Sequence, residues 1–128
     1  MAKTIAILGA SRMRNKFGNK AVRAYQQAGY EVYPVNLNPR EGDIEGLKTY
    51  QSLAQIPVSL DRISLYLPPP VTLELLGEIA AKGAGQVWFN PGTYDAEVLR
   101  RAQEAGIPAV EGCSIVDLGM TPSQFPDA

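Results

Sequence analysis

Ile5-Ala6-Ile7-Leu8-Gly9-Ala10-Ser11-Arg12-Met13-Arg14-Asn15-Lys16-Phe17-Gly18-Asn19 is the stretch that decides the fold. An apolar run of strand length ends at Gly9, a polar and basic turn follows, and helix-forming residues begin at about Lys20. This order is typical of the first strand, loop and helix of a nucleotide-binding α/β domain, in which free N–H groups at the helix start attract phosphate. An ordinary strand-to-helix turn would read similarly, because Gly9 and Gly18 do not complete the dinucleotide fingerprint.

The distribution of charge favours the nucleotide-binding interpretation. Residues 1–30 carry six basic side chains and no acidic one, whereas the rest of the chain carries all 13 acidic side chains. A solvated basic helix face would also give this pattern, but beside a glycine-containing loop it indicates a local anion site. One small patch lacks the broad basic surface and interleaved aromatic residues of nucleic-acid-binding proteins. We therefore expect no nucleic-acid partner.

Length and composition indicate a soluble globular protein. The chain has 128 residues, enough to bury a core, and is 45% apolar and 20% charged. No apolar run approaches the ~20 residues that cross a membrane, and residues 1–4 lead directly into a strand, so we expect neither membrane insertion nor a signal peptide. A single cysteine fits a reducing cytoplasm. Because histidine is absent, a zinc site of the usual Cys/His kind is excluded.

Strand-like and helix-like segments alternate along the chain. Strands are predicted at about residues 3–8, 30–35, 62–67, 86–89 and 107–110, and the main helices at about residues 19–28, 71–82 and 95–104. Such alternation implies right-handed crossovers. We therefore predict an α/β fold, a Rossmann-like doubly wound parallel sheet of about five strands in the order 3-2-1-4-5, with helices on both faces.

No linker or repeat divides the chain, so residues 1–128 are predicted to form a single domain. Residues 119–128 contain two prolines and little to bury. We expect them to be a loosely held tail.

Ligands of such sheets bind beyond the carboxyl ends of the strands, where the strand order reverses. Residues 9–19, 36–40, 67–70 and 90–92 would meet at that edge, and all are rich in Gly, Pro, Asn or basic residues. NAD usually requires a carboxylate after the second strand, but no acid occurs there until Glu41. Arg40, together with Arg12, Arg14 and Lys16, indicates a ligand with a third phosphate, for which NADP and coenzyme A both qualify.

Four motifs resemble those of one known family: Gly9-Ala10-Ser11-Arg12 with Lys16-Phe17-Gly18-Asn19-Lys20, Gly29-Tyr30-Glu31-Val32-Tyr33-Pro34-Val35-Asn36, Gly46-Leu47-Lys48-Thr49-Tyr50-Gln51-Ser52-Leu53, and Leu67-Pro68-Pro69-Pro70. The chain resembles the small stand-alone CoA-binding proteins, which are similar to the N-terminal CoA-binding domain of the succinyl-CoA synthetase alpha subunit. The resemblance covers about residues 3–118.

The resemblance implies a site for coenzyme A or an acyl-CoA at the carboxyl edge of the sheet. The residues implied at the CoA phosphates are Gly9, Ala10, Ser11, Arg12, Lys16, Phe17, Gly18 and Asn19. The residues implied near the adenosine 3′-phosphate and ribose are Val35, Asn36, Asn38 and Arg40. The adenine would be flanked by Leu67, Pro68 and Pro69. The pantetheine arm would lie near Asn90 and Pro91.

We therefore predict a cytoplasmic CoA-binding protein that has no catalytic or metal-ligating residues of its own and acts with an unidentified protein partner. Two alternatives stay open: an NADP-binding oxidoreductase or a subunit of one, and a structural subunit with a vestigial nucleotide site. Cys113 is interpreted as a small buried hydrophobe, because a lone cysteine after a strand more often packs than reacts.

Overall fold

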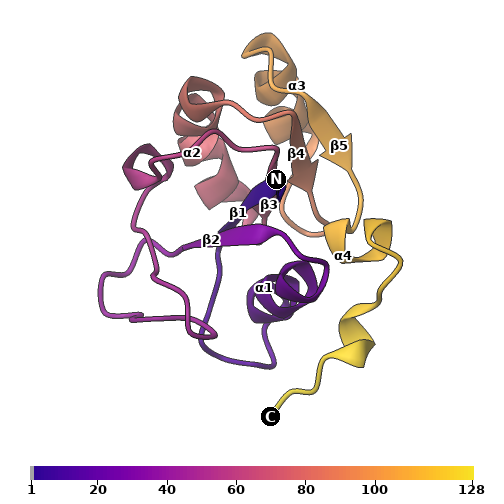
Figure 1. The fold of residues 1–128 in the computed structure, drawn as a ribbon. Helices are drawn as coiled ribbons and strands as arrows, with labels where there is room; N and C mark the ends of the chain where they lie inside the picture. The colour runs from indigo at the N-terminus through magenta and orange to yellow at the C-terminus, as the bar shows by residue number, and fades with distance from the viewer. Residues whose placement is uncertain (1) are drawn as a thin grey trace.

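A computed structural model describes residues 2–128 (Figure 1). The elements in chain order are β1 (Thr4–Leu8), α1 (Phe17–Gln27), β2 (Glu31–Val35), η1 (Leu53–Gln55), β3 (Arg62–Leu65), α2 (Pro69–Lys82), β4 (Gln86–Phe89), α3 (Ala96–Glu104), β5 (Ala109–Glu111), α4 (Ser114–Asp117) and η2 (Pro122–Gln124). The five strands form one sheet, and every pairing between them is parallel. The predicted α/β class and parallel sheet are confirmed.

The strand order is β2-β1-β3-β4-β5, so one placement differs from the predicted 3-2-1-4-5. The third strand lies beside β1, with Leu65 opposite Leu8, and not beside β2. The outer edge of β2 is already used, because the Tyr50 N–H donates to the Pro34 carbonyl and the Tyr50 carbonyl accepts from the Asn36 N–H. Both orders reverse next to β1, so the predicted ligand edge is unchanged.

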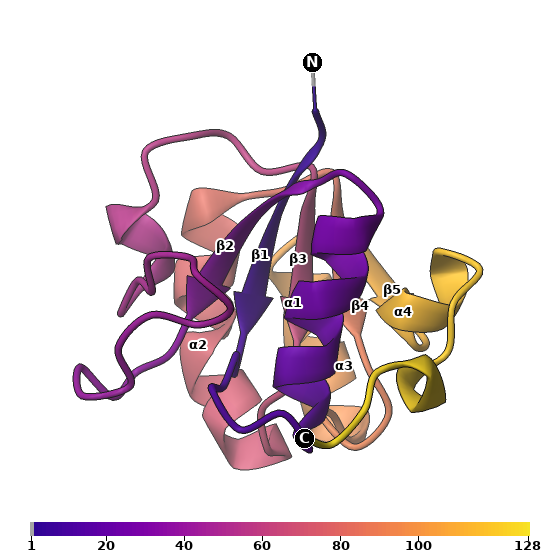
Figure 2. The same cartoon turned by 60° about the horizontal axis from the view of Figure 1, so that its bottom comes forward.

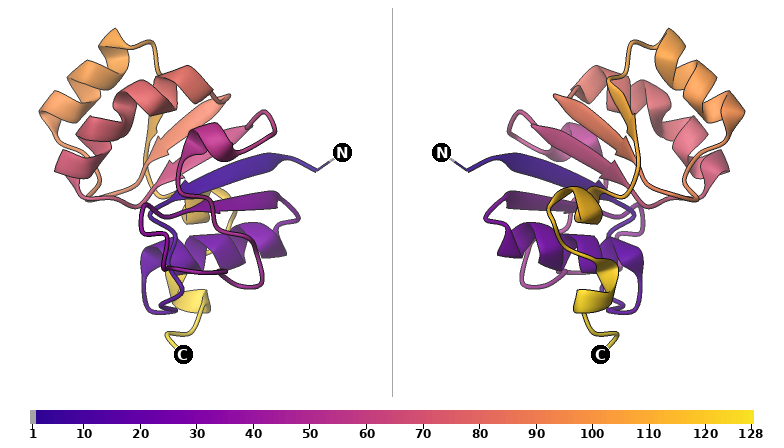
Figure 3. Two further views of the ribbon diagram at one scale, coloured as in Figure 1. Left: turned by 90° about the vertical axis from the view of Figure 1, so that its left-hand side faces the viewer. Right: turned by 90° about the vertical axis from the view of Figure 1, so that its right-hand side faces the viewer.

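Helices cover both faces of the sheet, as Figures 2 and 3 show. Side chains alternate across β1: Ile5 and Ile7 join the apolar cluster under α1 and α4, whereas Ala6 and Leu8 join the cluster under α2 and α3. All strand side chains of β1 are buried. This two-sided burial explains why β1 reads as a continuous apolar run.

Two helices begin earlier than the sequence indicated. Helix α1 begins at Phe17, and α2 begins at Pro69 with Pro68 as its N-cap, where starts at about residues 19 and 71 were expected. Proline is accepted in a first helical turn because its missing N–H would have had no partner there. The proline run therefore starts α2, whereas β3 already ends at Leu65.

Residues 119–128, expected to be a loosely held tail, contact α1 through a few side chains. Phe125 is only 7% exposed and packs in the α1 cluster. The Lys20 ammonium contacts the Asp127 carboxylate at 2.6 Å, and the Arg23 guanidinium donates to the Pro126 carbonyl at 2.9 Å. The composition of residues 119–128 does not predict these contacts, because their partners lie on α1. Within residues 2–128, no helix is both long and apolar enough to span a membrane.

Candidate functional site

A cavity of about 400 Å³ opens at the carboxyl edge of the sheet. Its walls come from the first loop, the start of α1, and the segments that follow β3 and β4. The lining residues are Gly9, Lys16, Phe17, Gly18, Tyr66, Leu67, Pro68, Pro69, Pro91, Gly92 and Thr93. Three of the four loops predicted to meet therefore do meet, and the 36–40 loop does not reach this cavity.

The cavity depends on close contact between three backbone segments. Gly9 has a φ of +85°, and a Cβ on it would lie 2.2 Å from the Tyr66 carbonyl oxygen. A Cβ on Gly18 would lie 2.1 Å from the Gly9 carbonyl oxygen. Glycine at both positions therefore lets the start of α1 rest on the first loop, and lets that loop rest on the chain leaving β3.

The start of α1 presents hydrogen-bond donors to the cavity. The N–H groups of Phe17 and Gly18 have no hydrogen-bond partner within residues 2–128. The N-cap, Lys16, makes no side-chain capping bond, and the first turn contains no acidic residue. With the positive end of the helix dipole, this end of α1 is suited to an anion such as phosphate.

The start of α2, on the opposite wall, offers no such donors. Pro69 and Pro70 have no N–H, and the N–H groups of Val71 and Thr72 both donate to the Pro68 carbonyl. Leu67 and Pro68 therefore face the cavity as a surface for a flat or aliphatic group. The cleft is thus asymmetric, with donors on the α1 side and apolar contacts on the α2 side.

Positive charge near the cleft is only partly available to a ligand. Arg14 pairs with Glu45 at 2.9 Å, and this hydrogen bond is the main reason that the pKa of the Glu45 carboxyl lies below its usual value. Arg12, Lys16 and Arg40 are exposed, and none of them pairs with a carboxylate side chain in the described part of the chain. Of these three cations, Lys16 lines the cavity and is placed to meet an anion there.

Three predicted site asparagines hold the loops together. Asn19 is buried and donates to the Ser11 carbonyl at 2.8 Å, and Asn36 donates to the Ala10 carbonyl at 2.7 Å. Asn90 donates to Ser64 Oγ and the Leu65 carbonyl, both at 2.8 Å, and accepts from the Ser114 N–H at 2.9 Å. Their amides fix the loop backbones, and only Asn90 lines a hollow, described below.

The remaining predicted residues lie around the cavity and not in its wall. The Val35 carbonyl accepts from the N–H groups of Gly9 and Ala10, and Ser11 Oγ accepts from the Met13 N–H. Arg12 is exposed on the first loop, and its N–H donates to a Glu41 carboxylate oxygen at 2.6 Å. Asn38 lines a separate hollow of about 90 Å³.

Sequence reasoning missed Tyr66 and Thr93 as cavity residues. Tyr66 directly precedes Leu67 in the chain, so its place after β3 was a usable signal. Thr93 is buried, and its hydroxyl donates to the Asn90 carbonyl at 2.6 Å. Nothing in the sequence distinguishes this threonine from an ordinary helix-capping residue.

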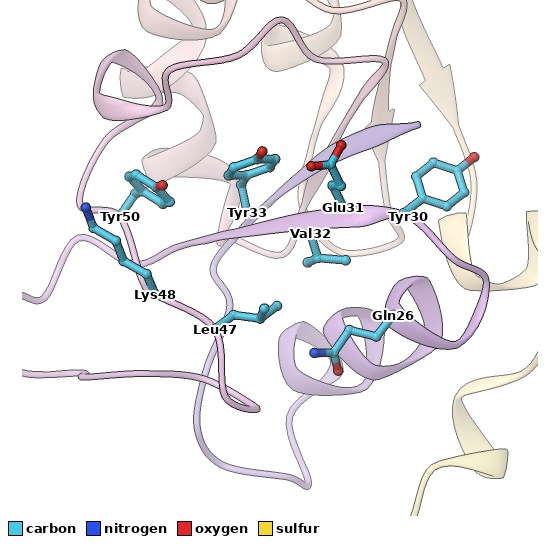
Figure 4. Close-up of a pocket in the computed structure, with 8 residues that line it drawn as sticks. All are labelled: Gln26, Tyr30, Glu31, Val32, Tyr33, Leu47, Lys48 and Tyr50. Atoms are coloured by element: carbon cyan, nitrogen blue, oxygen red, sulfur yellow. The ribbon is translucent and has the colours of Figure 1, made fainter. Parts of the chain in front are cut away.

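A second hollow, of about 330 Å³, lies along the edge strand β2. Figure 4 shows its residues on β2, on α1 and on the segment that carries Leu47, Lys48 and Tyr50. Lys48 lies over the Tyr50 ring at 4.9 Å, and that ring lies 5.9 Å from the Tyr33 ring. No glycine loop or helix start opens onto it, so we assign it no nucleotide.

The main cleft contains few groups that could transfer a proton. Lys16 and Tyr66 are its only titratable side chains. Burial raises the pKa of the Tyr66 phenol well above its usual value, so this group stays neutral near pH 7. Within residues 2–128, no cluster of three His, Cys, Asp or Glu side chains is arranged to hold a metal ion.

Comparison with known proteins identifies a family. A family model described as a CoA binding domain matches residues 3–119. The acetate–CoA ligase (ADP-forming) II of Archaeoglobus fulgidus is 33% identical over 117 residues, which are 82% of this chain and 17% of the ligase. The chain spans between 11% and 18% of the length of other CoA ligases and synthases that it matches.

Shorter proteins match over most of their length. The uncharacterized protein YneT of Bacillus subtilis (strain 168) is 27% identical over 105 residues, covering 82% of this chain and 76% of YneT. Among solved structures, a conserved hypothetical protein from Pyrococcus furiosus is 34% identical with a TM-score of 0.79, covering 91% of this chain and 99% of that one.

Proposed function

The chain belongs to the CoA-binding domain family, and on that basis we propose that it binds coenzyme A, free or acylated, in the cleft at the carboxyl edge of the sheet. The observation that carries this proposal is the uncapped start of α1, whose free N–H groups open onto the cleft. The diphosphate of the ligand would accept from the N–H groups of Phe17 and Gly18, with Lys16 beside it.

The two walls of the cleft match the two halves of the ligand. Leu67 and Pro68 offer the apolar surface that the adenine requires, and Pro91 lies on the side from which the pantetheine arm would leave. Arg12 and Arg40 are the unpaired cations closest in sequence to the loops implied for the 3′-phosphate. Asn19 and Asn36 support the first loop indirectly through its carbonyl groups.

We propose binding without turnover by these residues alone. Backbone donors, prolines and glycines hold a ligand but move no proton, and a hydroxyl such as that of Ser11 is a weak nucleophile without a base beside it. The ligase activity named for several relatives belongs to chains of which this one spans a small part. A reducing cytoplasm is part of this proposal, supported by the single cysteine. A protein partner is also part of it, supported by two relatives that are named as alpha subunits.

Calorimetric titration with CoA, 3′-dephospho-CoA and NADP tests the proposal. CoA should bind the most tightly, and Arg12→Ala should weaken CoA binding about tenfold, since a charge-assisted hydrogen bond is worth roughly 1.5–3 kcal/mol. Arg100→Ala is the matched control, because Arg100 is an exposed cation on α3. Tighter binding of NADP would support the oxidoreductase alternative, and no binding of any ligand would support a vestigial site.

A further inference from the structure

We propose that a small apolar pocket beside the cleft receives the acyl group of a short-chain aliphatic acyl-CoA. This inference rests on the proposed function and specifies its ligand. The pocket has a volume of about 140 Å³ and is lined by Phe17, Tyr66, Asn90, Pro91, Cys113, Ile115 and Pro122. The pocket thus gives a selective role to α4 and to η2.

The pocket adjoins the cleft through shared side chains. Phe17, Tyr66 and Pro91 line both hollows, so these residues form the boundary between them. Phe17 is 60% exposed, an unusual position for a large apolar side chain at a helix start. A pantetheine arm that passes Pro91 would deliver its thioester to this boundary.

The size of the pocket fits a short hydrocarbon chain. A cavity of about 150 Å³ lined by apolar side chains holds a molecule as large as benzene. Acyl groups of about four to six carbons therefore match the available volume. Longer chains would have to leave the pocket or displace Pro122, which contributes to its wall.

The lining also selects against charged acyl groups. The Asn90 amide is fully used, because its nitrogen donates to two acceptors and its oxygen accepts from the Ser114 N–H. The remaining polar groups are the Tyr66 hydroxyl, which lies 3.4 Å from Ser114 Oγ, and the Cys113 thiol. No cation lines the pocket. A dicarboxylic acyl group such as succinyl would therefore bury an unpaired carboxylate there.

The buried network beneath the pocket keeps its shape fixed. Ser64 Oγ and Ser114 Oγ lie 2.7 Å apart, and Asn90 bonds both Ser64 Oγ and the Ser114 backbone. The first residue of α4 is thereby anchored to β3 and to the end of β4. The pocket is held by buried hydrogen bonds, so it is preformed for its ligand.

Calorimetry with free CoA, butyryl-CoA and succinyl-CoA tests the inference. Each buried methylene is worth about fourfold in affinity, so butyryl-CoA should bind about tenfold or more tightly than CoA. Succinyl-CoA should bind no more tightly than CoA. Across straight-chain acyl-CoAs the gain should stop at about six carbons. Equal affinities for butyryl-CoA and succinyl-CoA, or a gain that continues along longer chains, would overturn the inference.

A variant that fills the pocket tests whether the preference for butyryl-CoA arises there. Cys113→Phe should remove the preference for butyryl-CoA and leave CoA affinity within about twofold, since Cys113 does not line the main cleft. Val116→Phe is the matched control, because Val116 lies on α4 with its side chain 55% exposed. A preference that survives in Cys113→Phe overturns the inference. Failure of wild-type protein to bind CoA at all would instead refute the proposed function.

Discussion

Replacing Gly18 by alanine tests whether the start of α1 must rest directly on the first loop. The new Cβ would lie 2.1 Å from the Gly9 carbonyl oxygen and 3.0 Å from its carbonyl carbon. Both are backbone atoms, so no side-chain rotation relieves the overlap. The start of α1 must move away by about 1 Å or more to reach ordinary van der Waals contact.

The expected net effect is a loss of stability. Alanine is favoured over glycine in a helix by up to about 1 kcal/mol, whereas overpacking a tight contact costs typically 1–3 kcal/mol. We expect the free energy of unfolding to fall by about 1–2 kcal/mol. The displacement also moves the Phe17 and Gly18 N–H groups away from a bound phosphate, which should weaken CoA binding about tenfold.

Urea unfolding followed by the fluorescence of Trp88, the only tryptophan, measures the stability, and calorimetry measures the affinity. Gly77→Ala is the matched control, because Gly77 lies within α2 and a Cβ there meets nothing within 4 Å. That variant should gain about 0.5–1 kcal/mol and bind CoA normally. A Gly18→Ala protein that is as stable as Gly77→Ala, and that binds CoA equally well, would refute the reasoning.

Two further predictions concern the residues that hold the loops. Asn90→Ala removes an amide with three buried partners, so the free energy of unfolding in urea should fall by about 2–4 kcal/mol; an unchanged urea midpoint would contradict this. The folded pKa of Glu45 is lowered chiefly by its hydrogen bond with Arg14, so its stabilisation is present above about pH 4.3 and is lost as the pH falls through the folded pKa. Glu45→Gln should therefore flatten the acid-side fall of the urea midpoint, and an equally steep fall in the variant would exclude this role.

The fold was predictable from sequence where local pattern decides it. The apolar run of β1 and the alternation of strands and helices were enough to predict the parallel sheet, and the family resemblance is confirmed by the match over residues 3–119. The position of β3 beside β1 depends on a pairing between segments that are far apart in the sequence. Tyr50 takes the hydrogen bonds of the outer edge of β2, and no local pattern around Tyr50 predicts that pairing.

The candidate site was predictable in its loops but only partly in its residues. Backbone geometry explains both outcomes. Glycines and prolines indicate where the chain turns, and Gly9, Gly18 and Pro68, which the sequence placed in the loops at the sheet edge, line the cavity. The side-chain amide of asparagine can form hydrogen bonds equally well with a ligand or with a neighbouring backbone carbonyl group. Only the folded structure shows that the Asn19 and Asn36 amides donate to loop carbonyls.

The two sides of the cleft offer a ligand different groups. The start of α1 has free N–H donors suited to phosphate, the proline-rich segment forms an apolar wall, and the sheet joins them through Gly9. Such a site would hold a thioester without polarising it, because burial raises the pKa of the Tyr66 phenol and keeps this group neutral near pH 7. Turnover of the bound acyl group would therefore need a base that the cleft lining does not supply, and attack by the Cys113 thiol of the neighbouring pocket would only exchange one thiol for another. Adding acetyl-CoA or butyryl-CoA to the purified protein should accordingly release no free thiol above the uncatalysed background.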